Sequence, residues 1–347
     1  MTKVRGLVLE RHNEPPKLHE IDVLEPGPGE VRVRMQAAGL CHTDISNVRD
    51  ARTTPLLLGH EGAGVIESVG EDVDGLSMGT RVLVCWKVPC RECRHCSAGR
   101  LHLCERVQEL GEPRFFWAGR ALPPLLNAGC FSELVVLPAA AAIPLDDRLG
   151  DEQAALIGCA VATGVGAVLK TAQVEPGARV GVWGAGGVGL NVVAAARLAE
   201  ASAIVAVDPD PKRRELALAR GATDVVEPGA EIAELDYAFE VVGEPEIMAE
   251  ALSALGIGGT LVLVGAAARD ATLSFHPRAF MSKQQRIVGC IYGSLHPHED
   301  LPELLRWCAE GRLPLDDLVG TTITLDELPA AFVEPPRDGV RTVVTFA

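Results

Sequence analysis

Long uninterrupted apolar runs are missing from this sequence of 347 residues. Residues 1–6 pass directly into an apolar alternation without the hydrophobic segment of a secretory signal. No later stretch reaches the length of a membrane span without a charge or a glycine. We therefore expect a cytoplasmic protein with no membrane partner.

Basic residues are also scarce, with 32 Lys and Arg against 47 Asp and Glu and a formal net charge of −15. Nucleic-acid-binding proteins normally gather Lys and Arg on one surface, whereas the basic clusters here, such as 212–214, are short. We expect no nucleic-acid partner. Internal repeats and low-complexity segments are absent too, and 48% hydrophobic with 23% charged residues is typical of a globular chain long enough for two domains.

A change of pattern near residue 155 indicates the domain organisation. Short alternating or apolar runs between Gly and Pro turns predict a β-rich domain before it, with strands at 31–35, 64–69, 81–84 and 134–137. Apolar runs then alternate with helical patterns, with strands at 179–184, 203–208, 236–242, 259–265 and 286–292 and helices at 187–200, 211–220 and 245–255. This alternation predicts an α/β domain with a doubly wound parallel sheet of the Rossmann type over 160–292. A predicted helix at 300–310 and a predicted strand at 340–346 do not continue this alternation of strands and helices. We therefore expect the Rossmann-type domain to be inserted into a β-rich domain of 1–159 and 293–347.

The predicted sheet domain contains a glycine motif, Gly-Ala-Gly-Gly-Val-Gly at 184–189, between a strand and a helix. Gly184 would permit the tight turn, Gly186 would let the backbone approach a diphosphate, and Gly189 would let the helix pack against the strand. Free N–H groups at the helix N-terminus, where Gly187 lies, would bind the diphosphate. The motif therefore predicts a dinucleotide cofactor.

The acid after the next strand bears on which dinucleotide binds. Asp208 suits a free ribose 2′-hydroxyl and repels a 2′-phosphate, which favours NAD. Arg213 and Arg214 follow shortly after it and could accept a phosphate, so NADP remains the alternative.

Ten cysteines are many for a cytosolic chain, in which thiols stay reduced unless they bind metal or take part in chemistry. Cys90, Cys93, Cys96 and Cys104 fall within fifteen residues and can close a tetrahedral shell around one Zn²⁺. A shell with four thiolates has no place for a substrate, so this zinc would be structural. Iron–sulfur ligation uses similar spacings and is the alternative.

A second group of possible ligands is dispersed: Cys41 in Cys-His-Thr-Asp, His60 in Gly-His-Glu-Gly, and Cys159 after Gly158. Spacing cannot show that they meet. Taken singly, each cysteine could be a small buried residue and His60 a hydrogen-bonded core histidine.

Together these motifs resemble the zinc-dependent alcohol dehydrogenases of the medium-chain dehydrogenase/reductase superfamily, almost from end to end. The resemblance is carried by the segments 39–44, 59–64, 90–104, 158–164, 184–189 and 340–344. It implies a GroES-like catalytic domain around the Rossmann domain, two Zn²⁺ per chain, NAD, a small alcohol or aldehyde as substrate, and a homodimer or homotetramer.

By that resemblance Cys41, His60 and Cys159 hold a catalytic Zn²⁺ with its fourth position open. Glu61 would approach the metal transiently, and Asp44 would orient His60. The zinc would act as a Lewis acid on the alcohol oxygen, and the nicotinamide would accept the hydride.

The same resemblance assigns the proton path. Thr43 would take the proton of the alcohol and pass it to the cofactor ribose. Ser46 stands where the best-known members have a relay histidine, and a hydroxyl can only pass a proton on through water. His42 replaces a common arginine near the expected diphosphate, and histidine, unlike arginine, changes its charge near neutral pH.

Three further roles follow from the resemblance. Val188 would lie behind the nicotinamide, Arg341 would bind the diphosphate, and Trp86 would line the substrate pocket, although Trp86 could equally be a core residue. Between Cys104 and Ser132 the chain is shorter than in longer members and rich in aromatics and proline.

The substrate therefore stays open. An alcohol or aldehyde is the first hypothesis, and a hydroxymethyl-thiol adduct of formaldehyde or a bulky conjugated substrate is the alternative. A non-catalytic protein that binds zinc and dinucleotide is the alternative from another class, against which the retention of all three presumed ligands and Thr43 argues.

Overall fold

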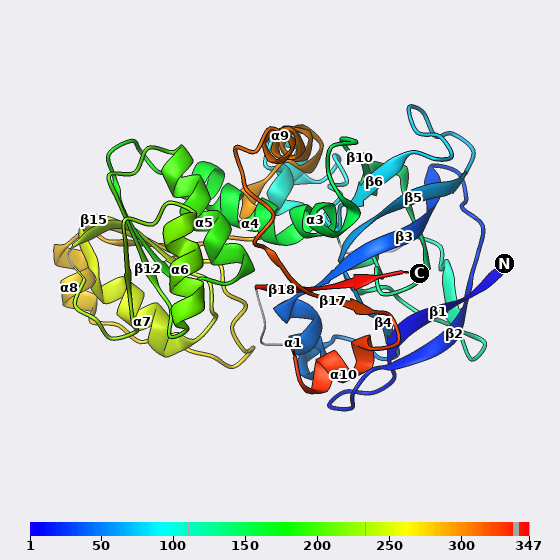
Figure 1. The fold of residues 1–347 in the computed structure, drawn as a ribbon, viewed down its shortest axis with the longest axis horizontal. Coiled ribbons are helices and arrows are strands. Elements are labelled where there is room, and N and C mark those ends of the chain that lie inside the picture. The colour runs from blue at the N-terminus through cyan, green and yellow to red at the C-terminus, as the bar shows by residue number, and fades with distance from the viewer. Residues whose placement is uncertain (108, 110, 233, 336–339, 347) are drawn as a thin grey trace. The chain divides into compact units, whose positions relative to one another are not determined.

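The computed structural model describes residues 1–107, 109, 111–232, 234–335 and 340–346 (Figure 1). The chain forms two compact units, one of Met1–Cys159 with His296–Ala347 and one of Ala160–Leu295. The sequence placed the second boundary at 292. The second unit is thus one continuous segment, and the first is completed by the end of the chain.

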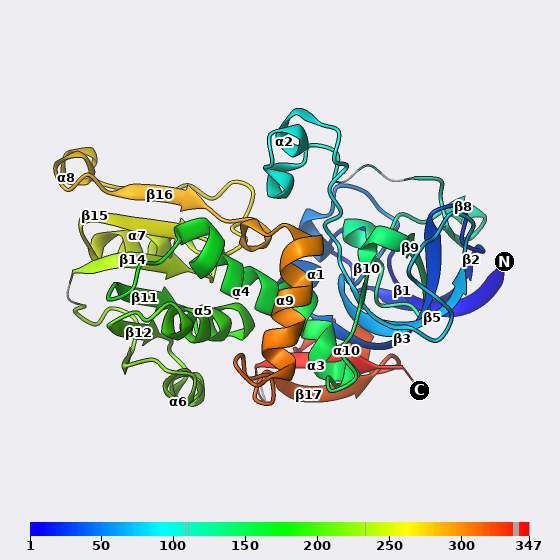
Figure 2. The same ribbon diagram turned by 90° about the horizontal axis from the view of Figure 1, so that it is seen from above.

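The second unit carries a six-stranded parallel sheet in the order β13-β12-β11-β14-β15-β16 (Figure 2). Its strands are β11 (Arg179–Trp183), β12 (Ala203–Val207), β13 (Asp224–Val226), β14 (Leu235–Glu240), β15 (Leu255–Leu263) and β16 (Arg286–Gly289). Its longer helices are α5 (Gly187–Leu198), α6 (Pro211–Ala219), α7 (Pro245–Ser253) and α8 (Pro277–Ser282). Counted from β11, the strand order is 3-2-1-4-5-6, the order of dinucleotide-binding folds. The predicted doubly wound sheet is confirmed.

Two predicted strands extended too far at their C-terminal ends. The predicted strand 236–242 ends at Glu240, because the chain turns at Val241–Gly243 and Gly243 has a φ of +96°. The predicted strand 286–292 ends at Gly289, and Tyr292 begins the short 3₁₀ helix η6 (Tyr292–Ser294). Apolar side chains continue past both strands, so hydrophobicity alone does not mark where they end.

A helical stretch from Asp151 to Ala172 was not anticipated. It consists of α3 (Asp151–Leu156), the π-helical turn η4 (Ile157–Val161), α4 (Ala162–Gly166) and the π-helical turn η5 (Ala167–Ala172). By length and composition it could cross a membrane, but 78% of its most apolar window is buried inside the fold. A core helix accounts for it.

The first unit contains two sheets, one in the order β4-β1-β2-β7-β8 and one in the order β10-β6-β5-β3-β18-β17, with β9 also paired to β3. The strands are β1 (Thr2–Leu9), β2 (Lys17–Val23), β3 (Glu30–Leu40), β4 (Leu56–Leu57), β5 (Glu61–Val69), β6 (Arg81–Val84), β7 (Phe115–Trp117), β8 (Arg120–Ala121), β9 (Leu134–Pro138), β10 (Ala142–Pro144), β17 (Val319–Thr324) and β18 (Arg341–Thr345). The helices include α1 (His42–Asp50), α2 (Arg94–Ser97), α9 (Pro297–Ala309) and α10 (Leu328–Val333), with the 3₁₀ turns η1 (Leu101–Leu103), η2 (Leu125–Asn127) and η3 (Ala139–Ala141). In β3, the buried Val31, Val33 and Met35 alternate with arginines, the period of a strand with one core face.

Three strand ends meet in the second of these sheets. Gly39 of β3 pairs with Glu61 of β5, and Leu40 pairs with Thr342 of β18, both antiparallel. The last residues of β3 therefore lie beside the first residues of β5 and β18. Residues directly outside these ends come together, although they are distant in sequence.

Candidate active site

Four side chains converge where these strands end. Donor atoms of Cys41, His60, Glu61 and Cys159 all lie within 4.8 Å of one another. Cys41 follows β3, His60 directly precedes β5, and Glu61 is the first residue of that strand. Cys159 lies in the π-helical turn η4, a local widening that is frequent at functional sites. The three ligands proposed from the sequence are thus brought together.

Backbone geometry at Gly59 determines where His60 lies. Gly59 has a φ of +93°, and a Cβ there would lie 2.3 Å from the backbone nitrogen of Phe131. A backbone hydrogen bond also fixes the position of Gly59, because the Cys130 N–H donates to the Gly59 carbonyl at 2.9 Å. Only glycine fits this turn without displacing the chain.

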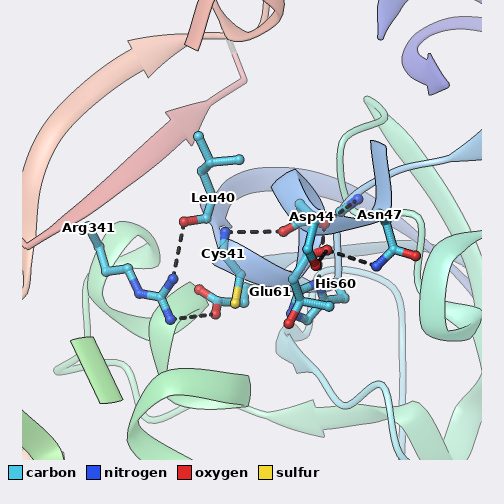
Figure 3. A network of polar contacts seen from close by, with 10 residues as sticks. Leu40, Cys41, Asp44, Asn47, His60, Glu61 and Arg341 are labelled. Atoms are coloured by element: carbon cyan, nitrogen blue, oxygen red, sulfur yellow. Dashed lines mark hydrogen bonds and ion pairs between the residues drawn. The ribbon is translucent and has the colours of Figure 1, made fainter. Parts of the chain in front are cut away.

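Asp44 is fully buried. Figure 3 shows the contacts of its carboxylate with the residues around the cluster. Its carboxylate accepts hydrogen bonds from the backbone N–H groups of Cys41 and Gly59, each at 3.1 Å, and lies 3.2 Å from Nδ1 of His60. An Nδ1–H that donates to this carboxylate leaves Nε2 for a metal. Burial alone would lower the pKa of His60, but the Asp44 carboxylate and the Cys41 sulfur together outweigh it, and the net shift is upward.

The two cysteines of the cluster share a hydrogen bond. It lowers the pKa of Cys41 well below its ordinary value and, together with burial, raises that of Cys159. One thiolate is therefore favoured even without a cation, and a bound cation would favour both. A buried set of two sulfurs and one imidazole fits Zn²⁺.

Glu61 and Arg341 form an ion pair that sequence reasoning did not foresee. Nη2 of Arg341 lies 3.2 Å from Oε1 of Glu61, and Nη1 donates to the Leu40 carbonyl at 3.2 Å (Figure 3). Burial raises the pKa of Glu61 to about 7, against the influence of the guanidinium. The second oxygen, Oε2, has no hydrogen-bond partner among the described residues.

The residues of the predicted proton path lie in the first two turns of α1. Thr43 is half-buried and His42 is exposed. The hydroxyl of Ser46 donates to the Thr43 carbonyl at 3.1 Å, and the Asn47 side chain donates to the same oxygen at 2.8 Å. Ser46 is thus engaged with the backbone of its own helix.

Trp86 lies next to the cluster. Its ring is 6.4 Å from that of His60, in an edge-to-face arrangement at 90°, and the residue is only 8% exposed. Nζ of Lys87 lies 5.8 Å from the Trp86 ring centroid. Trp86 is thus both a packed side chain and a neighbour of a candidate metal ligand.

The second cysteine cluster is closed. The sulfur atoms of Cys90, Cys93, Cys96 and Cys104 lie within 4.8 Å of one another, with 3.9 Å between those of Cys90 and Cys96. Zn–S bonds of about 2.3 Å give a tetrahedron with edges of about 3.8 Å, which matches. Backbone N–H groups, first that of Cys96, lower the pKa of Cys93 to about 6, whereas burial raises that of Cys96 to about 12. This set fits a structural zinc.

The glycine motif in the second unit leaves room for an anion. Gly184 has a φ of +99°, and a Cβ at Gly189 would lie 1.8 Å from the Gly184 carbonyl oxygen. By contrast, a Cβ at Gly186 would meet no atom of the described residues within 4 Å. Gly187 and Val188 begin α5, and no side chain of the described residues caps its N-terminus. Its free N–H groups fit a diphosphate.

Asp208 supports the same turn. Its side chain is buried, and Oδ2 accepts a hydrogen bond from the Ala185 N–H at 2.8 Å. Arg214 donates to the Asp208 carbonyl at 2.7 Å, whereas Arg213 reaches Asp210 only at 3.9 Å. Arg214 is therefore engaged by the backbone, and Arg213 is the less constrained cation of the two.

Comparisons with known proteins identify the family of the chain. The model of the alcohol dehydrogenase GroES-like domain matches residues 27–147, and that of the zinc-binding dehydrogenase matches residues 187–310. An S-(hydroxymethyl)glutathione dehydrogenase of Escherichia coli O1:K1 is 34% identical, over 99% of this chain and 100% of its own length.

Two solved structures extend the similarity to the whole fold. An alcohol dehydrogenase zinc-binding domain protein from Burkholderia ambifaria has a TM-score of 0.92 at 28% identity, covering 100% of this chain and 99% of that one. Benzyl alcohol dehydrogenase from Acinetobacter calcoaceticus has a TM-score of 0.91 at 27% identity, covering 100% of both chains. The predicted fold class and family resemblance are confirmed: this chain belongs to the zinc-dependent alcohol dehydrogenases of the medium-chain dehydrogenase/reductase superfamily.

Proposed function

We propose that the chain transfers hydride between an alcohol or its aldehyde and NAD, at a zinc ion held by Cys41, His60 and Cys159. The observation that carries the proposal is the convergence of these three donors within 4.8 Å. Three protein ligands leave one tetrahedral position for a substrate. The four-cysteine cluster would hold a second, structural zinc.

Bound at this site, zinc would supply Lewis-acid activation of the alcohol oxygen, and the nicotinamide would accept the hydride. Asp44, 3.2 Å from Nδ1 of His60, would hold the proton on that nitrogen and leave Nε2 as the atom that would bind the metal. Thr43 would receive the proton of the alcohol. The Ser46 hydroxyl is directed at the Thr43 carbonyl, so it would pass that proton on only through water.

The Glu61 carboxylate lies beside the three ligands, and its Oε2 has no hydrogen-bond partner among the described residues, which supports a transient approach to the metal. Arg341 would bind the diphosphate, aided by His42, with Val188 behind the nicotinamide. Trp86 would form the pocket wall nearest His60, because the two rings already pack against each other.

NAD is the cofactor that this chain suits better. The buried carboxylate of Asp208 can accept hydrogen bonds from ribose hydroxyls and opposes a 2′-phosphate. Arg214 is held by the Asp208 carbonyl, which leaves Arg213 as the cation for a phosphate. We expect higher activity with NAD than with NADP.

A hydroxymethyl-thiol adduct is the second candidate substrate. It is favoured by the 34% identity to S-(hydroxymethyl)glutathione dehydrogenase over nearly the whole chain. Turnover of S-(hydroxymethyl)glutathione but not of simple alcohols would support it.

We also propose a homodimer or homotetramer in the cytoplasm, where reduced thiols remain available for zinc.

The test is a panel of alcohols, aldehydes and S-(hydroxymethyl)glutathione with NAD and NADP, read by nicotinamide absorbance. Cys159→Ala should lower activity more than ~100-fold, beyond the losses typical of residues behind the ligands. Zinc should fall from about two to about one per chain. Cys308→Ala, which changes a buried cysteine on α9, is the control. Full activity in Cys159→Ala, or no turnover of any substrate by the unaltered protein, would contradict the proposal.

A further inference from the structure

Glu240 is a buried acid in the dinucleotide domain to which the proposed chemistry assigns no role. It is the last residue of β14, is fully buried, and pairs with Trp183 at the end of β11. Its carbonyl accepts hydrogen bonds from the N–H groups of Val264 and Gly265, at 2.9 and 3.0 Å. Glu240 therefore lies where β11, β14 and β15 all end.

The Glu240 carboxylate holds the turn that follows it. Oε1 accepts hydrogen bonds from the Val242 N–H at 2.7 Å and the Gly243 N–H at 2.6 Å. Oε2 has no hydrogen-bond partner among the described residues. Burial raises the pKa of Glu240, and these backbone N–H groups oppose the rise. A buried carboxylate is costly, so the bonds to the turn are its main compensation.

This turn supports the glycine motif directly. The Val241 N–H donates to the Trp183 carbonyl at 3.1 Å. A Cβ placed on Gly184 would lie 2.8 Å from a methyl of Val242 and 3.1 Å from one of Val241. A Cβ placed on Gly189 would lie 3.3 Å from the same methyl of Val241. The two valines thus form the wall on which the predicted diphosphate turn rests.

We propose that Glu240 is a positioning residue for the dinucleotide, because its carboxylate fixes the Val241–Gly243 turn and through it the Gly184–Gly189 motif. The proposal rests on the proposed use of a nicotinamide dinucleotide. Glu240 would act on the cofactor through this turn and not by direct contact. Its loss should weaken cofactor binding and leave the zinc ligands in the first unit unchanged.

The experiment compares Glu240→Gln, Glu240→Asp and Glu240→Ala in the full-length protein. The Gln side chain keeps an oxygen within reach of the Val242 and Gly243 N–H groups. The Asp side chain is one methylene shorter, so its oxygens no longer reach them. We expect Asp and Ala to raise the Kd of NADH about tenfold and Gln to stay within about threefold of the unaltered protein. The KM for NAD should follow the Kd, while the KM for the alcohol and the zinc content should not change.

The matched control is Glu250→Ala. Glu250 also supports β11, by accepting a hydrogen bond from Trp183 Nε1 at 2.9 Å, but it does so from α7 and not through the turn. Equal losses of NADH affinity in Glu250→Ala and Glu240→Asp would overturn the proposal, as would unchanged affinity in Glu240→Asp. If Glu240→Ala does not fold, the comparison of Asp with Gln decides. No NADH binding by the unaltered protein would instead refute the proposed function.

Discussion

A carboxylate that need not bind the metal determines the geometry of the candidate zinc site. Asp44 is fully buried and contacts the backbone beside two of the proposed ligands, Cys41 and His60, as well as the His60 ring. Each bond joins a different part of the chain, namely the end of β3, the turn before β5 and the imidazole. The burial of this charge is tolerable because three N–H groups face it.

Asp44→Asn tests this role. An amide keeps the size of the side chain, but its NH₂ group would face one of the three N–H donors and leave it without an acceptor. We expect kcat/KM to fall about 10–100-fold and zinc at the catalytic site to bind more weakly. Activity and zinc content after dialysis would measure both.

Asp50→Asn is the matched control for that change. Asp50 ends the same helix and pairs with the exposed Arg49, away from the candidate ligands. It should leave both measurements unchanged. Full zinc content and activity in Asp44→Asn would show that the ligands hold their positions without this carboxylate.

The lobe that carries the four cysteines, residues 90–104, has little regular secondary structure. It contains only the four-residue helix α2 and the three-residue turn η1. Helices this short are not stable by themselves in water, so the fold of the lobe depends on the proposed zinc. The lobe is therefore expected to respond to metal removal as a unit.

Cys104→Ala should remove about one zinc per chain and lower Tm, because the lobe loses its cross-link. The first cluster, at Cys41, should keep its metal. Ser97→Ala, a change within the same lobe at a hydroxyl that reaches the Glu92 carbonyl at 3.4 Å, should alter neither quantity. Metal analysis combined with thermal unfolding would decide. An unchanged Tm with one zinc lost would contradict the dependence.

Elements differ in how far the sequence determines them. The strand, glycine turn and helix around 179–198 were predictable, because a buried apolar run, a φ of +99° at Gly184 and a long apolar helix are local properties. The pair of Glu61 and Arg341 was not, since it depends on the register of β3 with β5 and β18 across 280 residues. The π-helical turn that carries Cys159 was also missed, because periodicity cannot separate it from an α-helix.

At the scale of the whole molecule, the first unit is built from the two ends of the chain, with the second unit between them in sequence. β18 pairs with β3, so the first unit requires residues from both ends of the sequence. The second unit is one continuous segment that contains all six strands of its sheet and the apolar core around Trp183, Leu235 and Leu261. Among the described residues, the strands of that sheet pair with one another and the core side chains all lie within 160–295.

A fragment of residues 160–295 should therefore fold by itself and bind NADH. Its sheet, its core and the turn at 184–189 are all local, so we expect a cooperative thermal transition by circular dichroism. NADH should bind about tenfold more weakly than to the full chain, because Arg341, the proposed diphosphate partner, is absent. Gly186→Ala is the matched variant. Its methyl would meet no atom of the described residues within 4 Å, so it should preserve the fold while it fills the space proposed for the diphosphate. A fragment without a cooperative transition would show that the second unit needs the first, and equal NADH affinity in Gly186→Ala would place the diphosphate elsewhere.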